Sequence, residues 1–152
     1  MVNLKENIWL FLILGGILGI ISLFTATLYI SSEDALIWVW NLYISSYHVG
    51  FVQTDEILFT IGLISTAFIT IGTLITLLSG IFSKVKNKPL NILAIIGGLL
   101  ILISPIYYLV VISIVEENIW EYFSINIGSF LPFFAGAIPI LVGVIDLVKR
   151  KS

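Results

Sequence analysis

Four long apolar stretches constrain what this chain can fold into. They cover residues 8–30, 57–82, 90–115 and 125–148, and only the fourth contains a charged residue, Asp146. At a rise of about 1.5 Å per residue, each stretch is long enough to cross a hydrocarbon core about 30 Å thick. Because backbone groups in lipid must be satisfied within their own segment, we expect helices rather than open strands.

The amino-acid composition agrees with a membrane location. Hydrophobic residues make up 59% of the chain and charged residues 11%, whereas a soluble domain carries about 25% charged residues. A surface with so few charges is solvated by lipid rather than by water. We therefore predict an all-α membrane protein in which residues 1–152 form one domain, a bundle of four transmembrane helices.

The basic residues predict the topology of this bundle. All seven lie before the first stretch, between the second and third, or after the fourth: Lys5, Lys84, Lys86, Lys88, Lys149, Arg150 and Lys151. The two remaining loops, residues 31–56 and 116–127, contain only acidic charges: Glu33, Asp34, Asp55, Glu56, Glu116, Glu117 and Glu121. Since Lys and Arg mark cytoplasmic loops, we predict a multi-pass protein of the cell membrane. Both termini would be cytoplasmic and both acidic loops extracytoplasmic.

The two halves of the chain share a repeat at an offset of 82 residues. Gly15-Gly16 matches Gly97-Gly98, and Trp38 matches Trp120. This pattern predicts two helical hairpins in tandem, related by an axis along the membrane normal.

Small residues line one face of three predicted helices. Helix association in lipid relies on close packing of small residues, so we predict that these faces meet inside the bundle. The candidate packing residues are Gly15, Gly19, Ser22 and Ala26 in the first stretch, Gly62, Thr66, Thr73 and Thr76 in the second, and Gly128, Pro132 and Pro139 in the fourth. Each proline frees the carbonyl four residues earlier, which indicates a tolerated kink or, alternatively, a hinge or an ion-coordinating carbonyl.

Aromatic residues concentrate in the two outer loops. Ser31 and Asp34 have the spacing of a helix capping box, and an apolar run follows, so we predict a short interfacial helix in the first outer loop. The candidate interaction surface comprises Trp38, Trp40, Tyr43, Tyr47, Trp120 and Tyr122. Two interpretations stay open: an aromatic belt at headgroup depth, or a docking surface for a partner protein.

The remaining polar residues give no pattern typical of catalysis. The outer carboxylates follow no calcium-loop spacing, and His48, the only histidine, has no Cys or second His with which to share a metal. Asp146 has Arg150 as its i+4 neighbour, which predicts a helical ion pair. The chain has no cysteine and no catalytic set of Ser, His and Asp, so we predict no cofactor, no metal and no enzymatic activity.

The predicted layout of four spans, cytoplasmic termini and a longer first outer loop resembles that of claudins and tetraspanins. Residues 38–43 are similar to the tryptophan-containing first-loop signature of claudins, but the cysteine pair of that signature is absent. At 26 residues, the loop is short for the extracellular sheet of claudins. The resemblance implies a structural or interaction protein, or a small accessory subunit of a membrane complex.

The partners expected for such a protein are the lipid bilayer and other membrane proteins, including a second copy of the chain, but no nucleic acid. A passive transporter or channel protomer for a small neutral solute or lipid is the alternative. It is favoured by the threonine-lined face of the second stretch, on which Thr66, Thr73 and Thr76 lie.

Overall fold

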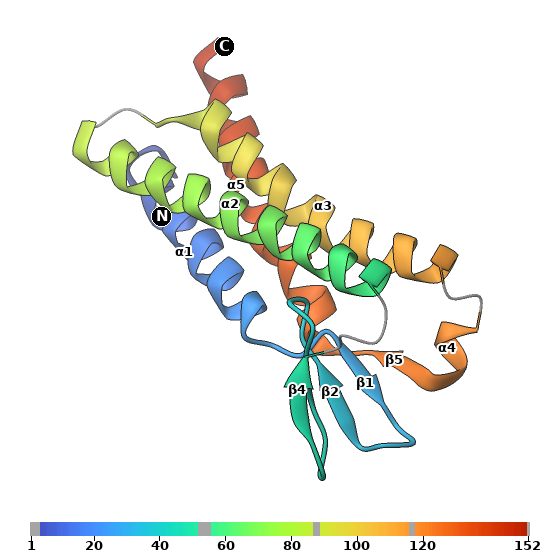
Figure 1. The fold of residues 1–152 in the computed structure, drawn as a ribbon. Coiled ribbons are helices and arrows are strands. Elements are labelled where there is room, and N and C mark those ends of the chain that lie inside the picture. The colour runs from blue at the N-terminus through green and yellow to red at the C-terminus, as the bar shows by residue number, and fades with distance from the viewer. Residues whose placement is uncertain (1–3, 52–55, 87–88, 116–117, 152) are drawn as a thin grey trace.

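The computed structural model describes residues 4–51, 56–86, 89–115 and 118–151 (Figure 1). Four long helices dominate it: α1 (Leu4–Leu23), α2 (Glu56–Lys86), α3 (Asn91–Val115) and α5 (Ile127–Lys151). α1 packs against α2 and α5, and α3 packs against the same two helices. The four helices therefore form a ring in which α1 and α3 lie on opposite sides.

Three of these helices are long and apolar enough to cross a membrane. They are α2, α3 and α5, whereas the apolar part of α1, Asn7–Leu23, is shorter. The prediction of membrane-type helices is confirmed, but within the described residues the structure supports three spans by length and composition rather than four.

α1 is shorter than predicted because the chain leaves the helix at Leu23 instead of continuing to Ile30. The hydroxyl of Ser22 bonds back to the carbonyl of Gly19 at 2.7 Å, and the amide of Phe24 bonds to the carbonyl of Ile21 at 3.1 Å. Such tightened i→i+3 bonds are typical of a helix end. The last residues of the predicted span then enter a β-strand.

The first outer loop forms a small β-sheet, so the prediction of an interfacial helix there is wrong. The strands are β1 (Leu28–Ile30), β2 (Ala35–Ile37), β3 (Leu42–Ile44) and β4 (Val49–Phe51). The second outer loop adds a single-turn helix, α4 (Ile119–Tyr122), and strand β5 (Phe123–Ile125). The strand order is β4-β3-β2-β1-β5, with every neighbouring pair antiparallel. The hairpins project away from the helices (Figure 1).

Turn residues explain why this loop is a sheet. Asp34 and Asn41 have positive φ angles of 48° and 65°, a conformation that Asn and Asp adopt more readily than other side chains. Asp34 therefore closes the turn between β1 and β2, where the capping-box spacing predicted a helix start. Because each strand has only three residues, a loop of this length is sufficient for a sheet.

The buried face of α2 is lined mainly by small and hydroxylated residues. Its buried positions are Ile61, Gly62, Ser65, Ile69, Gly72, Thr73, Thr76, Ser79, Gly80 and Ser83. Large apolar side chains such as Leu63, Ile71 and Leu74 are instead exposed on the outside of the bundle. Polar residues inside and apolar residues outside are the arrangement expected of a helix whose solvent is lipid.

Two hydrophobic clusters fill the bundle at its two ends. One joins the underside of the sheet to the helices and consists of Leu28, Ile37, Val39, Ile61, Ile69, Tyr108 and Ile112. The other lies at the opposite end and consists of Ile8, Leu12, Ala94 and Val142. The sheet and the helices therefore share one core at the end of the bundle that bears the sheet.

The glycine pairs of the predicted repeat occupy corresponding places in the ring. A Cβ atom on Gly15 would meet α5 at Pro139 and Ala135, and one on Gly16 would meet Leu77 of α2. A Cβ atom on Gly97 would meet Thr76 and Gly72 of α2, and one on Gly98 would meet Gly136 of α5. Exchanging α1 with α3 and α2 with α5 thus maps one set of contacts onto the other.

The candidate packing residues take several positions. Gly15, Gly19, Thr73, Thr76, Pro132 and Pro139 are buried between helices, as is Ser22 near the end of α1. Ala26 lies beyond α1, and its carbonyl accepts a hydrogen bond from the amide of Gly128 at 2.9 Å. Thr66 is partly buried and bonds to the carbonyl of Gly62. A Cβ atom on Gly62 would meet Asn41 of the sheet rather than another helix.

Candidate functional site

Two tryptophans connect the sheet to the end of α1. The indole N–H of Trp40 donates to the carbonyl of Leu23 at 2.7 Å, and that of Trp38 donates to the carbonyl of Phe24 at 2.9 Å. The last carbonyls of a helix have no partner within it, so these indoles act as side-chain caps. Both tryptophans are only half-buried and are held by these bonds.

Asn41 connects the sheet to α2. Its side chain is buried, and its amide Nδ2 donates to the carbonyl of Phe59 at 2.9 Å. Gly62 makes room for this contact, because a Cβ atom there would lie 2.2 Å from the same Nδ2 atom. The turn that contains Asn41 is therefore fixed against the helix.

The start of α5 is bound to the corner between α1 and β1. The amides of Asn126 and Gly128 donate to the carbonyls of Thr27 and Ala26, each at 2.9 Å. The hydroxyl of Ser129 donates to the same Thr27 carbonyl at 2.9 Å. Together with the pairing of β1 and β5, these bonds fix the second half of the chain to the first at the end of the bundle that bears the sheet.

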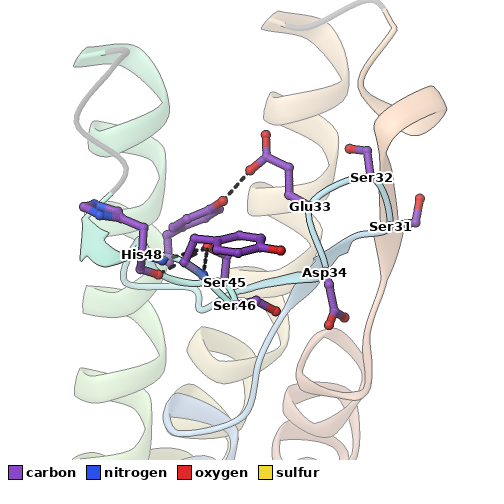
Figure 2. A pocket seen from close by; sticks show the side chains of 9 residues that line it. Ser31, Ser32, Glu33, Asp34, Ser45, Ser46 and His48 are labelled. Carbon is purple, nitrogen blue, oxygen red and sulfur yellow. Dashed lines mark hydrogen bonds between the residues drawn. The ribbon is translucent and has the colours of Figure 1, made fainter.

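A polar hollow of about 600 Å³ opens between the tips of the two hairpins, and we call it the tip cleft. Its lining residues are Ser31, Ser32, Glu33, Asp34, Tyr43, Ser45, Ser46, Tyr47 and His48. Figure 2 shows Glu33 on the β1–β2 turn facing the β3–β4 side, where Ser45 and His48 lie. Asp34, on the same turn, points in another direction (Figure 2).

Tyrosine hydroxyls hold both carboxylates of the β1–β2 turn. Tyr43 donates to Oε2 of Glu33, and Tyr29 donates to Oδ1 of Asp34 at 2.9 Å. These hydrogen bonds to a carboxylate are the main reason that the pKa of each tyrosine is raised above its ordinary value of 10.0. The hydrogen bond between Tyr43 and Glu33 therefore joins the β1–β2 turn to strand β3.

The β3–β4 turn is ordered by Ser45. Its Oγ atom accepts the amides of His48 at 3.1 Å and Tyr47 at 3.4 Å, and its own amide donates to the carbonyl of His48 at 2.9 Å. Tyr47 is 96% exposed at the end of this turn. Val49 and Phe51 of the edge strand β4 are also exposed.

The six aromatic residues predicted to form one interaction surface are divided among three places. Trp38 and Trp40 cap α1, whereas Tyr43 and Tyr47 line the tip cleft. Trp120 and Tyr122 lie in α4, where the Trp120 indole donates to Ser113 at 3.1 Å and Tyr122 is exposed. The structure does not bring the second-loop aromatics into the tip cleft.

At the other end of the bundle, Asp146 is buried and paired with α3. The Nδ2 atom of Asn91 donates to Oδ2 of Asp146 at 2.7 Å. The predicted partner Arg150 has a side chain outside the described residues. Near the same end, the ammonium group of Lys84 lies 4.0 Å from the centre of the Trp9 ring, a cation–π contact between α2 and α1.

No group of three or more His, Cys, Asp or Glu residues that could hold a metal occurs in the part of the chain that the structure describes. His48 lies at the rim of the tip cleft, where its ring is 6.4 Å from the ring of Tyr43.

Sequence reasoning did not identify Asn41 or Ser45 as important. The sequence signal that could have identified Asn41 is its position directly after an aromatic run, because asparagine is a residue type that favours turns.

Neither a family model nor a curated protein matches this sequence.

Proposed function

We propose that this chain is an integral protein of the cell membrane with four spans, cytoplasmic termini and an extracytoplasmic sheet. α2, α3 and α5 are long and apolar enough to cross. In favour of α1 as the fourth span, its side chains Leu10, Leu14 and Ile17 are exposed on the bundle surface. Large apolar side chains exposed along a helix are expected where the helix contacts lipid.

The distribution of basic residues supports this orientation. α2 begins beside the sheet and ends with Lys84 and Lys86, and α5 begins beside the sheet and ends with a basic segment that includes Lys149. These lysines thus lie at the end of the bundle opposite the sheet. The positive-inside rule would place that end in the cytoplasm.

We propose that the protein is not an enzyme and that it binds another membrane protein through its sheet, as a structural protein or an accessory subunit. The observation that carries this proposal is the contrast between the two sides of the sheet. Its inner side is fixed to helix ends by Trp38, Trp40 and Asn41. Its tip and edge leave Tyr47, Val49 and Phe51 exposed, and an edge strand with unpaired backbone groups is a ready template for a partner.

The resemblance to claudins supports the same proposal. It implies a structural or interaction protein, and in this chain residues 28–51 form a small sheet together with β5 of the second outer loop. The rigid mounting of the sheet suits recognition, because binding then costs little ordering of the protein.

Photo-crosslinking in native membranes tests the proposal. A photoreactive residue in place of Val49, on the edge strand, is expected to give a discrete adduct with a protein. The matched control replaces Leu141, which is exposed on α5, and is expected to give lipid adducts. If both positions yield only lipid adducts, the sheet does not bind a protein and the proposal is wrong.

A passive pathway for a small neutral solute or lipid is the second candidate. It is favoured by the hydroxyls of Ser65, Thr73 and Thr76, which are buried without a hydrogen-bond partner among the described residues. Large buried residues such as Leu12, Ile69 and Ile101 occupy the same interior, so a route would require an assembly of several copies. Flux of an uncharged solute into liposomes that contain the purified protein, compared with empty liposomes, separates this candidate from the first.

A further inference from the structure

We infer that the tip cleft binds a basic, Lys- or Arg-bearing segment of a partner protein. This inference rests on the proposed function, because it names the chemistry of the partner that the sheet would recognise.

Neither outer loop contains a lysine or arginine that could neutralise its carboxylates. No Lys or Arg occurs in residues 6–83 or in residues 89–148, and the two outer loops carry seven carboxylates. Glu33 and Asp34 are exposed at the tip, and their hydrogen-bond partners are neutral tyrosines. An uncompensated negative surface attracts cationic partners and speeds their association.

The tip cleft combines a carboxylate with an exposed aromatic ring. Tyr43 occupies Oε2 of Glu33, and an ionised carboxylate accepts further donors at its other oxygen. The ring of Tyr47, almost fully exposed, borders the same hollow. A carboxylate and an exposed aromatic ring that line one hollow suit a Lys or Arg side chain, which forms a charge-assisted hydrogen bond with the first and a cation–π contact with the second.

The position of the tip cleft restricts which molecule can supply the basic group. The hairpins project away from the helices (Figure 1), and the cleft is lined by residues of their turns, so it lies at a distance from the helices that lipid would surround. A second copy in the same membrane carries its lysines at the opposite end of the bundle, where Lys84, Lys86 and Lys149 lie. The occupant is therefore a basic segment of a different protein.

The test measures binding of a labelled oligo-lysine peptide to the full chain in nanodiscs of uncharged phosphatidylcholine. Wild type is expected to bind this peptide and not an oligo-glutamate peptide, and empty nanodiscs are expected to bind neither. The Glu33→Gln variant should weaken binding about fivefold, the effect of losing one exposed ion pair. Tyr47→Ser, which alters a nearly fully exposed side chain, should weaken it about twofold to threefold, as expected for an exposed cation–π contact.

The matched control is Glu121→Gln. Glu121 is exposed on α4, outside the cleft, and the variant loses the same charge from the outer end. It should leave affinity within about twofold of wild type, because salt screens charges that do not contact the peptide. Equal losses in Glu33→Gln and Glu121→Gln would show diffuse attraction by the acidic end and would overturn the inference.

The two proposals fail in different ways. If wild type does not bind oligo-lysine while the Val49 crosslink to a protein persists, the sheet has a partner of another chemistry and only this inference is wrong. If neither is observed, the proposed function fails as well. A melting measurement on each variant shows whether the sheet is intact, and the side-chain amide introduced by Glu33→Gln still offers Tyr43 an acceptor.

Discussion

Replacement of Asn41 tests how the sheet is mounted on the bundle. In Asn41→Ala the buried hydrogen bond from Nδ2 to the Phe59 carbonyl is lost, which costs about 1 kcal/mol. Alanine must also adopt the φ angle of 65°, and a side chain in this left-handed region costs about 1–2 kcal/mol more than glycine. The expected total is about 2–3 kcal/mol of lost stability.

Asn41→Gly separates these two effects. Glycine adopts the positive φ angle without steric cost, so only the hydrogen bond and the packing against Gly62 are lost, about 1 kcal/mol. The order of apparent melting temperatures in detergent should be wild type above Asn41→Gly above Asn41→Ala. Because unfolding of membrane proteins is often irreversible, all samples must be heated at one scan rate.

The control for this series is Asn118→Ala. Asn118 is exposed before α4, and its substitution should change the melting temperature little, as is usual for surface positions. If Asn41→Ala melts no lower than Asn118→Ala, the turn is not fixed to α2 as described. If Asn41→Gly melts as low as Asn41→Ala, the left-handed backbone contributes nothing and the reasoning about the turn is wrong.

Three further predictions concern topology, capping and ionisation. Single cysteines at Ser46 and Lys86 should react with a membrane-impermeant reagent from opposite sides of intact cells, and labelling of both from outside would contradict the proposed orientation. Trp40→Phe, which keeps the ring but removes the N–H that caps Leu23, should lower stability by about 1 kcal/mol in the same melting assay. Trp120→Phe should cost less, because Trp120 is itself exposed. The Tyr43 hydrogen bond to Glu33 raises the pKa of the phenol, so the stabilisation by this bond is present below pH 10 and is lost as the pH rises through the raised pKa. In Glu33→Gln the phenol of Tyr43 should titrate closer to pH 10. A near-ultraviolet titration curve that is unchanged in this variant would disprove the contact.

The helical part of the fold could be predicted from the sequence because its signals are local. Long runs without charge fix the helices of the bundle, and the basic residues near Lys84 and Lys149 mark one end of it. The polar interior of α2 was also indicated, since Thr73 and Thr76 share a face. These features depend only on the sequence of one segment and on its solvent.

The sheet could not be predicted because its determinants are long-range. β1 pairs with β2 next to it, but also with β5 from a loop about 95 residues further along the chain. The aromatic run around Trp38 fits a short helix at the interface and a strand equally well by pattern. The choice depends on Asp34 and Asn41, whose positive φ angles place turns on both sides of β2. The tip cleft follows from these turns, so it was missed for the same reason.

The last prediction tests the contact between Gly19 of α1 and Thr73 of α2. A Cβ atom at position 19 would lie 2.2 Å from Oγ1 of Thr73 and 3.2 Å from its Cβ atom, so Gly19→Ala forces the two helices apart or turns the threonine. Overpacking of this kind typically costs about 1–3 kcal/mol. Thr73→Ala alone should cost less, because its hydroxyl is buried without a hydrogen-bond partner among the described residues. In the double variant Gly19→Ala with Thr73→Ala, the closest clash is removed. The loss of stability of the double variant should therefore be clearly smaller than the sum of the losses of the two single variants, because the two residues are in direct contact. Ile17→Leu, at an exposed position on the same helix, is the control and should melt like wild type. Strict additivity of the two substitutions would show that α1 and α2 do not approach each other at this point, and the close packing assigned to the first helix would then be wrong.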